Sequence, residues 1–254
     1  MSLPKLTVPT YTLELPSTKQ EIKYRPFLVK EEKLLLIAMQ DSTDGNNKQI
    51  ISAVKDVIVN CTFDQVDVSK LTTYDLEYLF LQLRIKSRGS VTEMSFKCNN
   101  TLKNDDGSEH TCGHVNEIDF DLTTAKIVGD LTNKDKKIIL EEATQIGVIM
   151  KEPTFESVLE LSDSFLTGET QSVEDAYALL PKYIDTVFQG EETFDEFTDK
   201  EILDWLDELT EDQKNKIESF FDAIPKLSAN IEAKCSSCGY KEQVPVEGLA
   251  NFLA

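Results

Sequence analysis

The Cys-Ser-Ser-Cys-Gly stretch at residues 235–239 restricts the fold more than any other part of the chain. Two cysteines separated by two residues and followed by glycine are typical of a zinc knuckle, in which two thiolates reach one tetrahedral ion. The flanking residues indicate strands, because Ile231, Ala233 and Cys235 alternate and residues 240–246 run back after the turn. The stretch therefore predicts a β-hairpin that presents two thiolates at its turn.

A second pair of cysteines, Cys98 and Cys112, brackets the loop of another predicted hairpin. Residues 91–98 and 118–122 are strand-like, and the polar stretch between them contains the turn signal Asn-Asp-Asp-Gly at 104–107. The gap of 13 residues between the two cysteines is longer than usual knuckle spacing, which indicates a knuckle enlarged by an inserted loop. Four thiolates satisfy tetrahedral Zn²⁺. The predicted ligands of a structural zinc ion are Cys98, Cys112, Cys235 and Cys238.

Other uses of these cysteines remain open at this stage. His110 and His114 flank Cys112, and either could replace a thiolate. A redox pair usually sits at a helix start after a strand, so this alternative fits poorly, because Cys238 precedes a strand-like run. Free thiols are a further alternative. Disulfides fit poorly because nothing indicates secretion. The fifth cysteine, Cys61, follows an apolar helix and is expected to be an inert core thiol.

A four-thiolate site would determine how the chain is organised. It would have no open position for water, so its role would be structural. Because 122 residues lie between Cys112 and Cys235, the ion would join the two ends of a long insertion. The expected fold is α+β, a zinc-ribbon-like β-hairpin module with a helical N-terminal part and a helical insertion. The expected parts are an N-terminal arm and helices (1–90), a discontinuous zinc-stapled β module (91–122 plus 228–254) and an acidic helical insertion (123–227).

Helical signals support the N-terminal part and the insertion. Apolar residues with helical spacing occupy 50–58 and 76–83, after a short extended pair near the N-terminus. Residues 130–225 are expected to be mainly helical, with one start at Ser172 and two at capping boxes. The capping boxes pair Thr198 with Glu201 and Thr210 with Gln213. The apolar stripes that follow them are expected to be core rather than a binding groove.

The charge of the chain is strongly negative and unevenly spread. The chain has 254 residues, with 26 Lys and Arg against 46 Asp and Glu, a formal net charge of −20. This charge argues against nucleic acid and anionic lipid as partners. Residues 1–60 carry a net charge of +1, whereas residues 151–223 carry 5 Lys and 21 acidic residues, a net charge of −16. The acidic block is either a set of solvated helix faces or a surface for a basic partner.

Signals for membrane insertion, secretion and catalysis are missing from the sequence. The longest apolar run, 34–39, is far shorter than the roughly 20 residues that a membrane span needs. The first residues lack a signal-peptide core, so we expect the protein to stay in the compartment where it is made. Both histidines lie within two positions of Cys112, and there is neither a phosphate loop nor a Gly-x-Gly-x-x-Gly pattern. We therefore expect no enzymatic activity and no small-molecule substrate.

Parts of the sequence resemble the baseplate hub subunit family of T4-type contractile-tailed phages. The resemblance is carried by residues 9–17, 23–33, 60–62 and 74–84, and by the ending from Cys-x-x-Cys-Gly to Gly-Leu-x-Asn-Phe at 235–252. It implies a baseplate hub structural or assembly protein without known catalysis. It also implies that the partners are other phage baseplate hub or tail proteins, and that the protein is found in the virion tail baseplate or in the host cytoplasm during assembly.

Two other roles remain open. One is a tail-assembly chaperone that holds a tape-measure or hub protein and is absent from the mature particle, and the other is an unrelated zinc-ribbon adaptor. Tyr24, Arg25 and Phe27 are the first expected partner contacts, because aromatic and Arg side chains anchor interfaces. The alternative for these residues is packing within their own domain. The same two alternatives apply to the apolar Phe252-Leu253 end.

Overall fold

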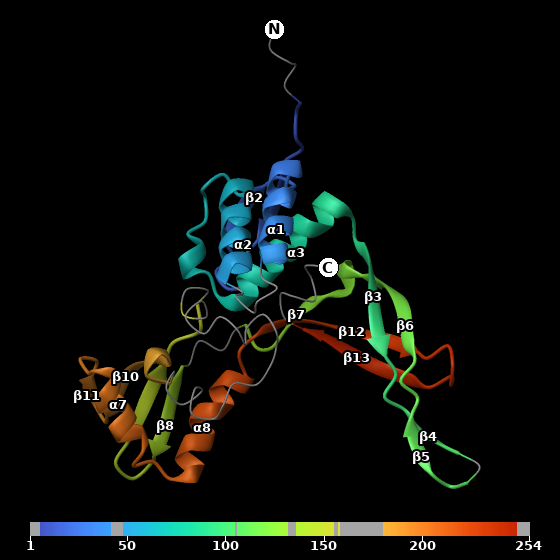
Figure 1. Cartoon of the computed structure of the whole chain (residues 1–254). Helices are drawn as coiled ribbons and strands as arrows, with labels where there is room; N and C mark the ends of the chain where they lie inside the picture. The colour runs from blue at the N-terminus through green and yellow to red at the C-terminus, as the bar shows by residue number, and fades with distance from the viewer. Residues whose placement is uncertain are drawn as a thin grey trace.

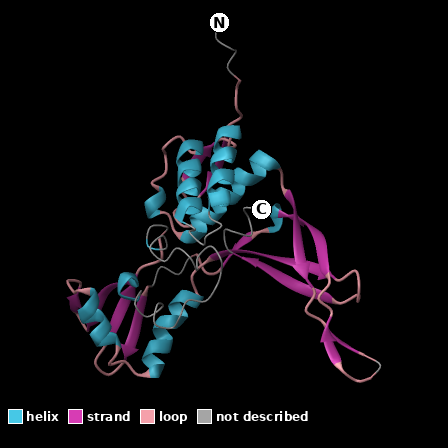
Figure 2. Cartoon of the chain, viewed as in Figure 1, coloured by secondary structure: helices cyan, strands magenta, loops and turns pink. Residues whose placement is uncertain are grey.

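The fold is α+β, as the sequence predicted. The computed structural model describes residues 6–41, 48–104, 106–131, 136–154, 157 and 180–247. A helical N-terminal body lies at the top of Figure 1, and two arms extend from it (Figures 1 and 2). The helix start expected at Ser172 and the apolar end at Phe252-Leu253 lie outside the described residues. Within the part of the chain that is described, no helix is both long and apolar enough to cross a membrane.

The N-terminal body packs three helices and a small hairpin around one core. Its elements are β1 (Tyr11–Glu14), β2 (Glu21–Tyr24), α1 (Val29–Asp41), α2 (Lys48–Cys61), the 3₁₀ helix η2 (Val68–Lys70) and α3 (Thr73–Arg88). The helices expected from the apolar stripes are confirmed as α2 and α3. Thr72 caps the start of α3, and Gly89 ends the helix with a positive φ of 98° that favours glycine.

The first arm, the cysteine arm (91–128 and 226–247), consists of hairpins. Its elements are β3 (Val91–Lys97), β4 (Thr101–Lys103), β5 (Glu109–Thr111), β6 (Val115–Asp121), the 3₁₀ helix η3 (Leu122–Thr124), β7 (Lys126–Val128), β12 (Lys226–Lys234) and β13 (Lys241–Glu247). Strand β3 pairs with β6 and β4 with β5, and β12 lies between β13 and β7, all antiparallel. The two hairpins predicted around the cysteine pairs are confirmed. Leu81 of α3 packs with Phe120 and Leu227, which attaches this arm to the N-terminal body.

The second arm, the sheet–helix arm (137–154 and 180–222), corrects the expectation of a helical insertion. Its elements are β8 (Lys137–Glu141), β9 (Ile146–Met150), β10 (Ile184–Gln189), β11 (Glu192–Phe194), α7 (Asp199–Leu206) and α8 (Glu211–Asp222). The four strands form one antiparallel sheet in the order β11-β10-β9-β8. Both predicted capping boxes are confirmed, and they start α7 and α8. The expectation that this region is mainly helical was wrong, because four of these six described elements are strands.

The missed sheet has local causes. Strand β8 contains the apolar run Ile138–Leu140 rather than a clean alternation, and a register shift interrupts its pairing with β9. Gly147 lets β9 approach β10 closely, because an added Cβ would lie 2.3 Å from the Phe188 ring. Gly190, with φ of 60°, turns the chain between β10 and β11 in two residues. Gly190 is a turn signal that is visible in the sequence itself.

Candidate metal centre

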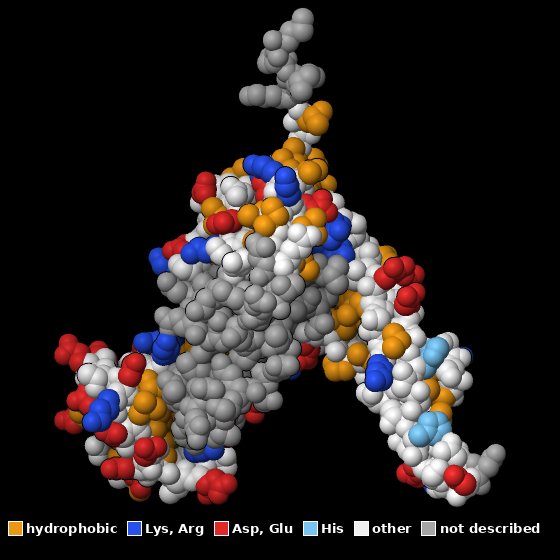
Figure 3. All heavy atoms as spheres, viewed as in Figure 1, with side chains coloured by type: hydrophobic (Ala, Val, Ile, Leu, Met, Phe, Trp, Pro, Cys, Tyr) orange, Lys and Arg blue, Asp and Glu red, His pale blue; other side chains and the backbone are white. Residues whose placement is uncertain are grey.

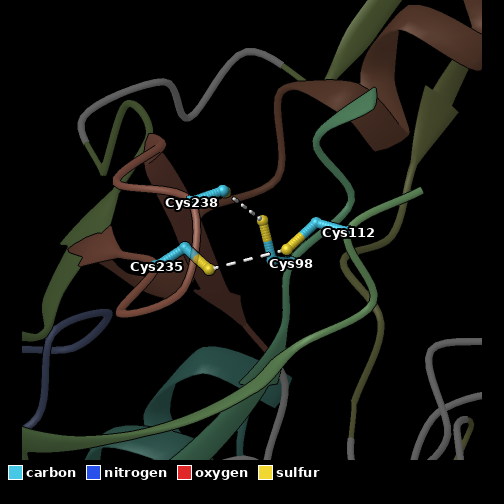
Figure 4. Close-up of side chains that lie close together, drawn as sticks. All are labelled: Cys98, Cys112, Cys235 and Cys238. Carbon is cyan, nitrogen blue, oxygen red and sulfur yellow. Dashed lines mark hydrogen bonds between the residues drawn. The ribbon is translucent and has the colours of Figure 1, made fainter. Parts of the chain in front are cut away.

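The sulfur atoms of four cysteines form one tight group at the turn ends of two hairpins (Figure 4). All four Sγ atoms lie within 4.8 Å of one another. The Sγ atoms of Cys98 and Cys238 are 3.7 Å apart, and those of Cys112 and Cys235 are 3.8 Å apart. A regular tetrahedron with metal–sulfur bonds of about 2.3 Å has sulfur–sulfur edges of about 3.8 Å. The four side chains therefore have a geometry that could hold one metal ion.

The turn between β12 and β13 positions Cys235 and Cys238. The backbone N–H of Gly239 donates to the carbonyl oxygen of Cys235 at 2.9 Å, and the N–H of Cys235 donates to that of Tyr240 at 2.8 Å. Gly239 has φ of 73°, a conformation that residues with a Cβ rarely adopt. The short turn therefore turns both sulfurs toward the same point.

The turn between β3 and β6 repeats this hydrogen-bond pattern around Cys98 and Cys112. The N–H of Gly113 donates to the carbonyl oxygen of Cys98 at 3.0 Å, and the N–H of Cys98 donates to that of His114 at 2.9 Å. Gly113 has φ of 64°, again in the left-handed region. The N–H of Cys112 donates to the Asn100 carbonyl at 2.8 Å and closes the base of the β4–β5 hairpin. The long gap between these two cysteines is thus a small hairpin inserted into a knuckle.

Asn116 connects the two knuckles and was missed by sequence reasoning. Its side-chain oxygen accepts hydrogen bonds from the backbone N–H of Ser236 at 2.8 Å and from the Ser236 hydroxyl at 2.9 Å. Its amide nitrogen donates to the carbonyl oxygen of His114 at 3.2 Å. The available signal was alternation, because Asn116 is a polar residue at a buried position in register with Ile118 and Phe120. Partners of this kind orient the ligands of metal sites.

The pKa values of Cys235 and Cys98 shift in opposite directions. The backbone N–H groups of Cys238 and Ser237 lower the pKa of Cys235 to about 6. The backbone N–H of Asn100 lowers the pKa of Cys98, but burial and the three neighbouring thiols raise it to about 12. Hydrogen bonds with the neighbouring thiols favour the neutral form of Cys98. A bound metal would favour the ionised thiols, since a metal binds thiolates and releases their protons.

Neither histidine belongs to the cysteine group. Among the described His, Cys, Asp and Glu residues, the group with ligand atoms close enough to share an ion consists of the four cysteines. A ring nitrogen of His114 instead lies 2.9 Å from the Ser236 hydroxyl, and His110 is exposed on β5 opposite Leu102. The two proposed substitutes thus lie beside the centre without entering it. The fifth cysteine, Cys61, is fully buried in the N-terminal core, and burial raises its pKa to about 11.

The expected partner contacts at 24–27 pack inside the N-terminal body. Tyr24 and Phe27 are only 2% and 9% exposed and belong to its core. Arg25 forms an ion pair with Glu31 at 2.8 Å, and both side chains are largely buried. These contacts agree with the alternative interpretation, in which the three residues pack within their own domain. A partner role for Tyr24, Arg25 and Phe27 stays a prediction.

One comparison with known proteins found a match. A family model described as T4 bacteriophage base plate protein matches residues 8–254, almost the whole chain. No curated protein and no solved structure is similar enough to this chain to count as a match.

Proposed function

Because the chain belongs to the T4 bacteriophage base plate protein family, we propose that it is a hub subunit or hub assembly protein of the phage baseplate. It acts by binding other baseplate hub or tail proteins and catalyses no reaction. The family match over residues 8–254 is the observation that carries this proposal. The hub assignment and the absence of catalysis are finer than the family description, and the resemblance of the N-terminal 90 residues to hub subunits supports the hub assignment.

We also propose that Cys98, Cys112, Cys235 and Cys238 bind one structural Zn²⁺ ion. The support is the chemistry of the donor set, since four thiolates in a tetrahedral arrangement suit zinc and leave no position for substrate water. The ion would hold the ends of the β3–β6 and β12–β13 hairpins together, so that the cysteine arm presents a fixed surface to its partners.

The metal assignment is tested by elemental analysis of the purified protein. We expect one zinc per chain in the parent and none in Cys238→Ser. Cys61→Ser is the matched control, because Cys61 is buried and lies outside the group of four. Equal zinc contents in the parent and Cys238→Ser would contradict the assignment.

The baseplate role is tested by quantitative mass spectrometry of purified phage particles, with this protein counted against known tail proteins. A constant number of copies per particle is expected for a hub subunit. If the protein is abundant in infected-cell lysate but absent from particles, it is an assembly factor. If it is absent from particles and from every tail-protein complex in the lysate, the proposed function is wrong.

The second candidate function is a tail-assembly chaperone that leaves before the particle is complete. The acidic block at 151–223 favours it, because a partner held by charge binds quickly and reversibly. A salt titration of complex formation separates the two roles. Strong weakening between low and moderate salt is expected for the chaperone, and little dependence on salt is expected for a permanent subunit.

We further propose that the chain divides into units at 1–90, 91–122 plus 228–254, and 123–227. The separate apolar cores of the N-terminal body and of the sheet–helix arm support this division. A third core lies in the cysteine arm and also includes Leu81 of α3. The unit at 123–227 contains both a sheet and helices. Its strand β7 is separate from that sheet, because β7 pairs with β12. Limited proteolysis should cut first between these units, and early cuts within α3 would contradict the division.

A further inference from the structure

The sheet–helix arm has an open groove lined by aromatic side chains. The groove lies between strands β9–β11 and helix α7 and has a volume of about 340 Å³. Its apolar lining includes Ile146, Phe188, Phe194, Phe197, Ile202 and Trp205. We call it the aromatic groove. It belongs to neither the cysteine centre nor the contacts at 24–27.

The outer part of this groove is exposed to solvent. Phe194, at the end of β11, is 49% exposed. Phe197 and Trp205 are half-buried, because each also packs against the core of the arm. Exposed aromatic surface that lines a concave site is typical of protein interfaces, where aromatic side chains provide most of the binding energy.

The elements around the aromatic groove are rich in acidic residues, which we call the acidic rim, and one of them, Glu201, lines the groove itself. Residues 184–209, which form β10, β11 and α7, contain ten Asp and Glu residues and a single Lys, Lys200. Among the described residues, only Asp185 of these ten acids forms an ion pair, with Lys151 at 3.2 Å. Figure 3 shows many acidic and some basic side chains beside a hydrophobic strip on this arm. One cation of the arm already lies at the groove, because Lys137 Nζ is 4.2 Å from the centroid of the Phe188 ring. The acids of residues 184–209 still outnumber the cations near them.

We propose that the aromatic groove docks a basic segment of a partner protein, in which Lys or Arg residues alternate with aliphatic or aromatic ones. The apolar side chains of the segment enter the groove, and its cations face the acidic rim. Charge complementarity selects this occupant. A second copy of the chain has a net charge of −20, and residues 158–179 contain five acidic residues and no Lys or Arg. This inference rests on the proposed function, because it names the kind of tail-protein segment that the chain binds.

Trp205 allows a direct test, since it is the only tryptophan of the chain. The probes are three synthetic 18-residue peptides: an amphipathic Lys/Leu peptide, its Glu/Leu counterpart and a Lys/Ser peptide without an apolar face. We expect the Lys/Leu peptide to shift the Trp205 emission to shorter wavelength with saturation at one peptide per chain. Its affinity should fall at least tenfold between 50 and 300 mM NaCl. The Glu/Leu and Lys/Ser peptides should bind at least tenfold more weakly.

Variants of exposed residues then locate the binding site by calorimetry. Phe194→Ser should weaken binding of the Lys/Leu peptide at least fivefold. Phe63→Ser is its matched control, because Phe63 is 47% exposed in the N-terminal body, and it should leave the affinity unchanged. The double change Asp195→Asn with Glu196→Gln should reduce the dependence on salt.

The charge control for the rim is the double change Glu117→Gln with Asp119→Asn. It removes two exposed acids from β6, and the dependence on salt should stay as in the parent.

Three results would overturn the proposal. They are equal affinity for the Lys/Leu and Glu/Leu peptides, equal loss of affinity in Phe194→Ser and Phe63→Ser, and binding without any change in Trp205 emission. None of these results touches the proposed function, which depends on particle composition. Conversely, the protein could bind the Lys/Leu peptide and yet be absent from particles and tail-protein complexes. In that case the groove proposal would stand and the baseplate role would be wrong.

Discussion

The two arms of the molecule are stabilised in different ways. In the sheet–helix arm, α7 and α8 pack against a sheet, and their apolar side chains form a core that includes Ile217, Val148 and Phe221. In the cysteine arm, the apolar core lies beside α3, and the turn ends of the hairpins meet through sulfur atoms (Figures 1 and 4). Two thin hairpins cannot bury much apolar surface at their ends, so a metal site can replace a core there.

The largest effect is expected from breaking the proposed metal centre. In small zinc modules, binding of the ion contributes about 10 kcal/mol or more of apparent free energy, and it is coupled to folding. Cys235→Ser should therefore open residues 91–121 and 226–247 to hydrogen exchange while leaving the Trp205 fluorescence of the other arm unchanged. A chelator that extracts the ion from the parent should have the same effect.

The control for this experiment is Cys61→Ala, which removes a buried thiol from the N-terminal body and should leave both hairpins of the cysteine arm protected. Unaltered exchange in Cys235→Ser would mean that the two arms do not differ as we describe.

The reciprocal change lies in the core of the sheet–helix arm. Ile217 on α8 is 1% exposed, and truncating a buried Ile to Ala costs about 2 to 5 kcal/mol because of lost transfer free energy and the cavity left behind. Ile217→Ala should lower the thermal stability and alter the Trp205 emission while the protein keeps its full zinc content. Loss of zinc in this variant would show that the arms unfold as one unit.

A third effect concerns Glu77, which attaches the cysteine arm to α3. Burial raises the pKa of Glu77 to about 7, although the backbone N–H of Leu227 donates to it at 3.4 Å and opposes the shift. The native state therefore holds a proton that the unfolded chain releases, and the associated stability is lost as the pH rises from about 4.5 to 7. Glu77→Gln should remove this loss and stabilise the protein at pH 8 by up to about 3 kcal/mol.

Chemical denaturation of the parent and Glu77→Gln at several pH values measures this effect. The two proteins should have similar stability near pH 4.5 and diverge as the pH rises. Parallel curves over the whole range would contradict the assignment.

The smallest effect is expected from shortening the first knuckle. Residues 101–111 form the β4–β5 hairpin, and their removal gives a Cys-Asn-Asn-Cys-Gly turn with the spacing of the second knuckle. Because the hydrogen bonds around Cys98 and Gly113 do not involve the hairpin, the variant should bind one zinc per chain and lose no more than about 1 kcal/mol of stability. Loss of zinc would mean that the hairpin itself holds the knuckle.

Local signals account for what could be predicted from the sequence. The capping boxes at Thr198 and Thr210 are contained within four residues, and they were found with the correct helix starts. Long apolar stripes predicted α2 and α3 for the same reason. The four cysteines of the candidate site were also identified from local signals. One pair has the short spacing of a zinc knuckle, and the other pair brackets the loop of a predicted hairpin.

The errors concern short strands and buried polar groups. The pairing of β9 with β10 joins residues more than thirty positions apart in the chain, and no local pattern specifies which strands meet. Burial of Glu77 and of the link from Asn116 to Ser236 likewise depends on which elements pack together. Tyr24 and Phe27 lie in the core, as the alternative of packing within the domain expects, and their partner role stays a prediction.

The sequence by itself determined the α+β class, the two cysteine hairpins, the main helices and the concentration of acidic charge. Each of these follows from spacing, from composition or from the chemistry of neighbouring residues. Only the tertiary structure decided that the insertion contains a sheet, that neither histidine joins the four sulfurs, and that aromatic side chains of the sheet and of α7 line one groove. These features depend on contacts between residues far apart in the chain, and such contacts are selected by the packing of the whole fold.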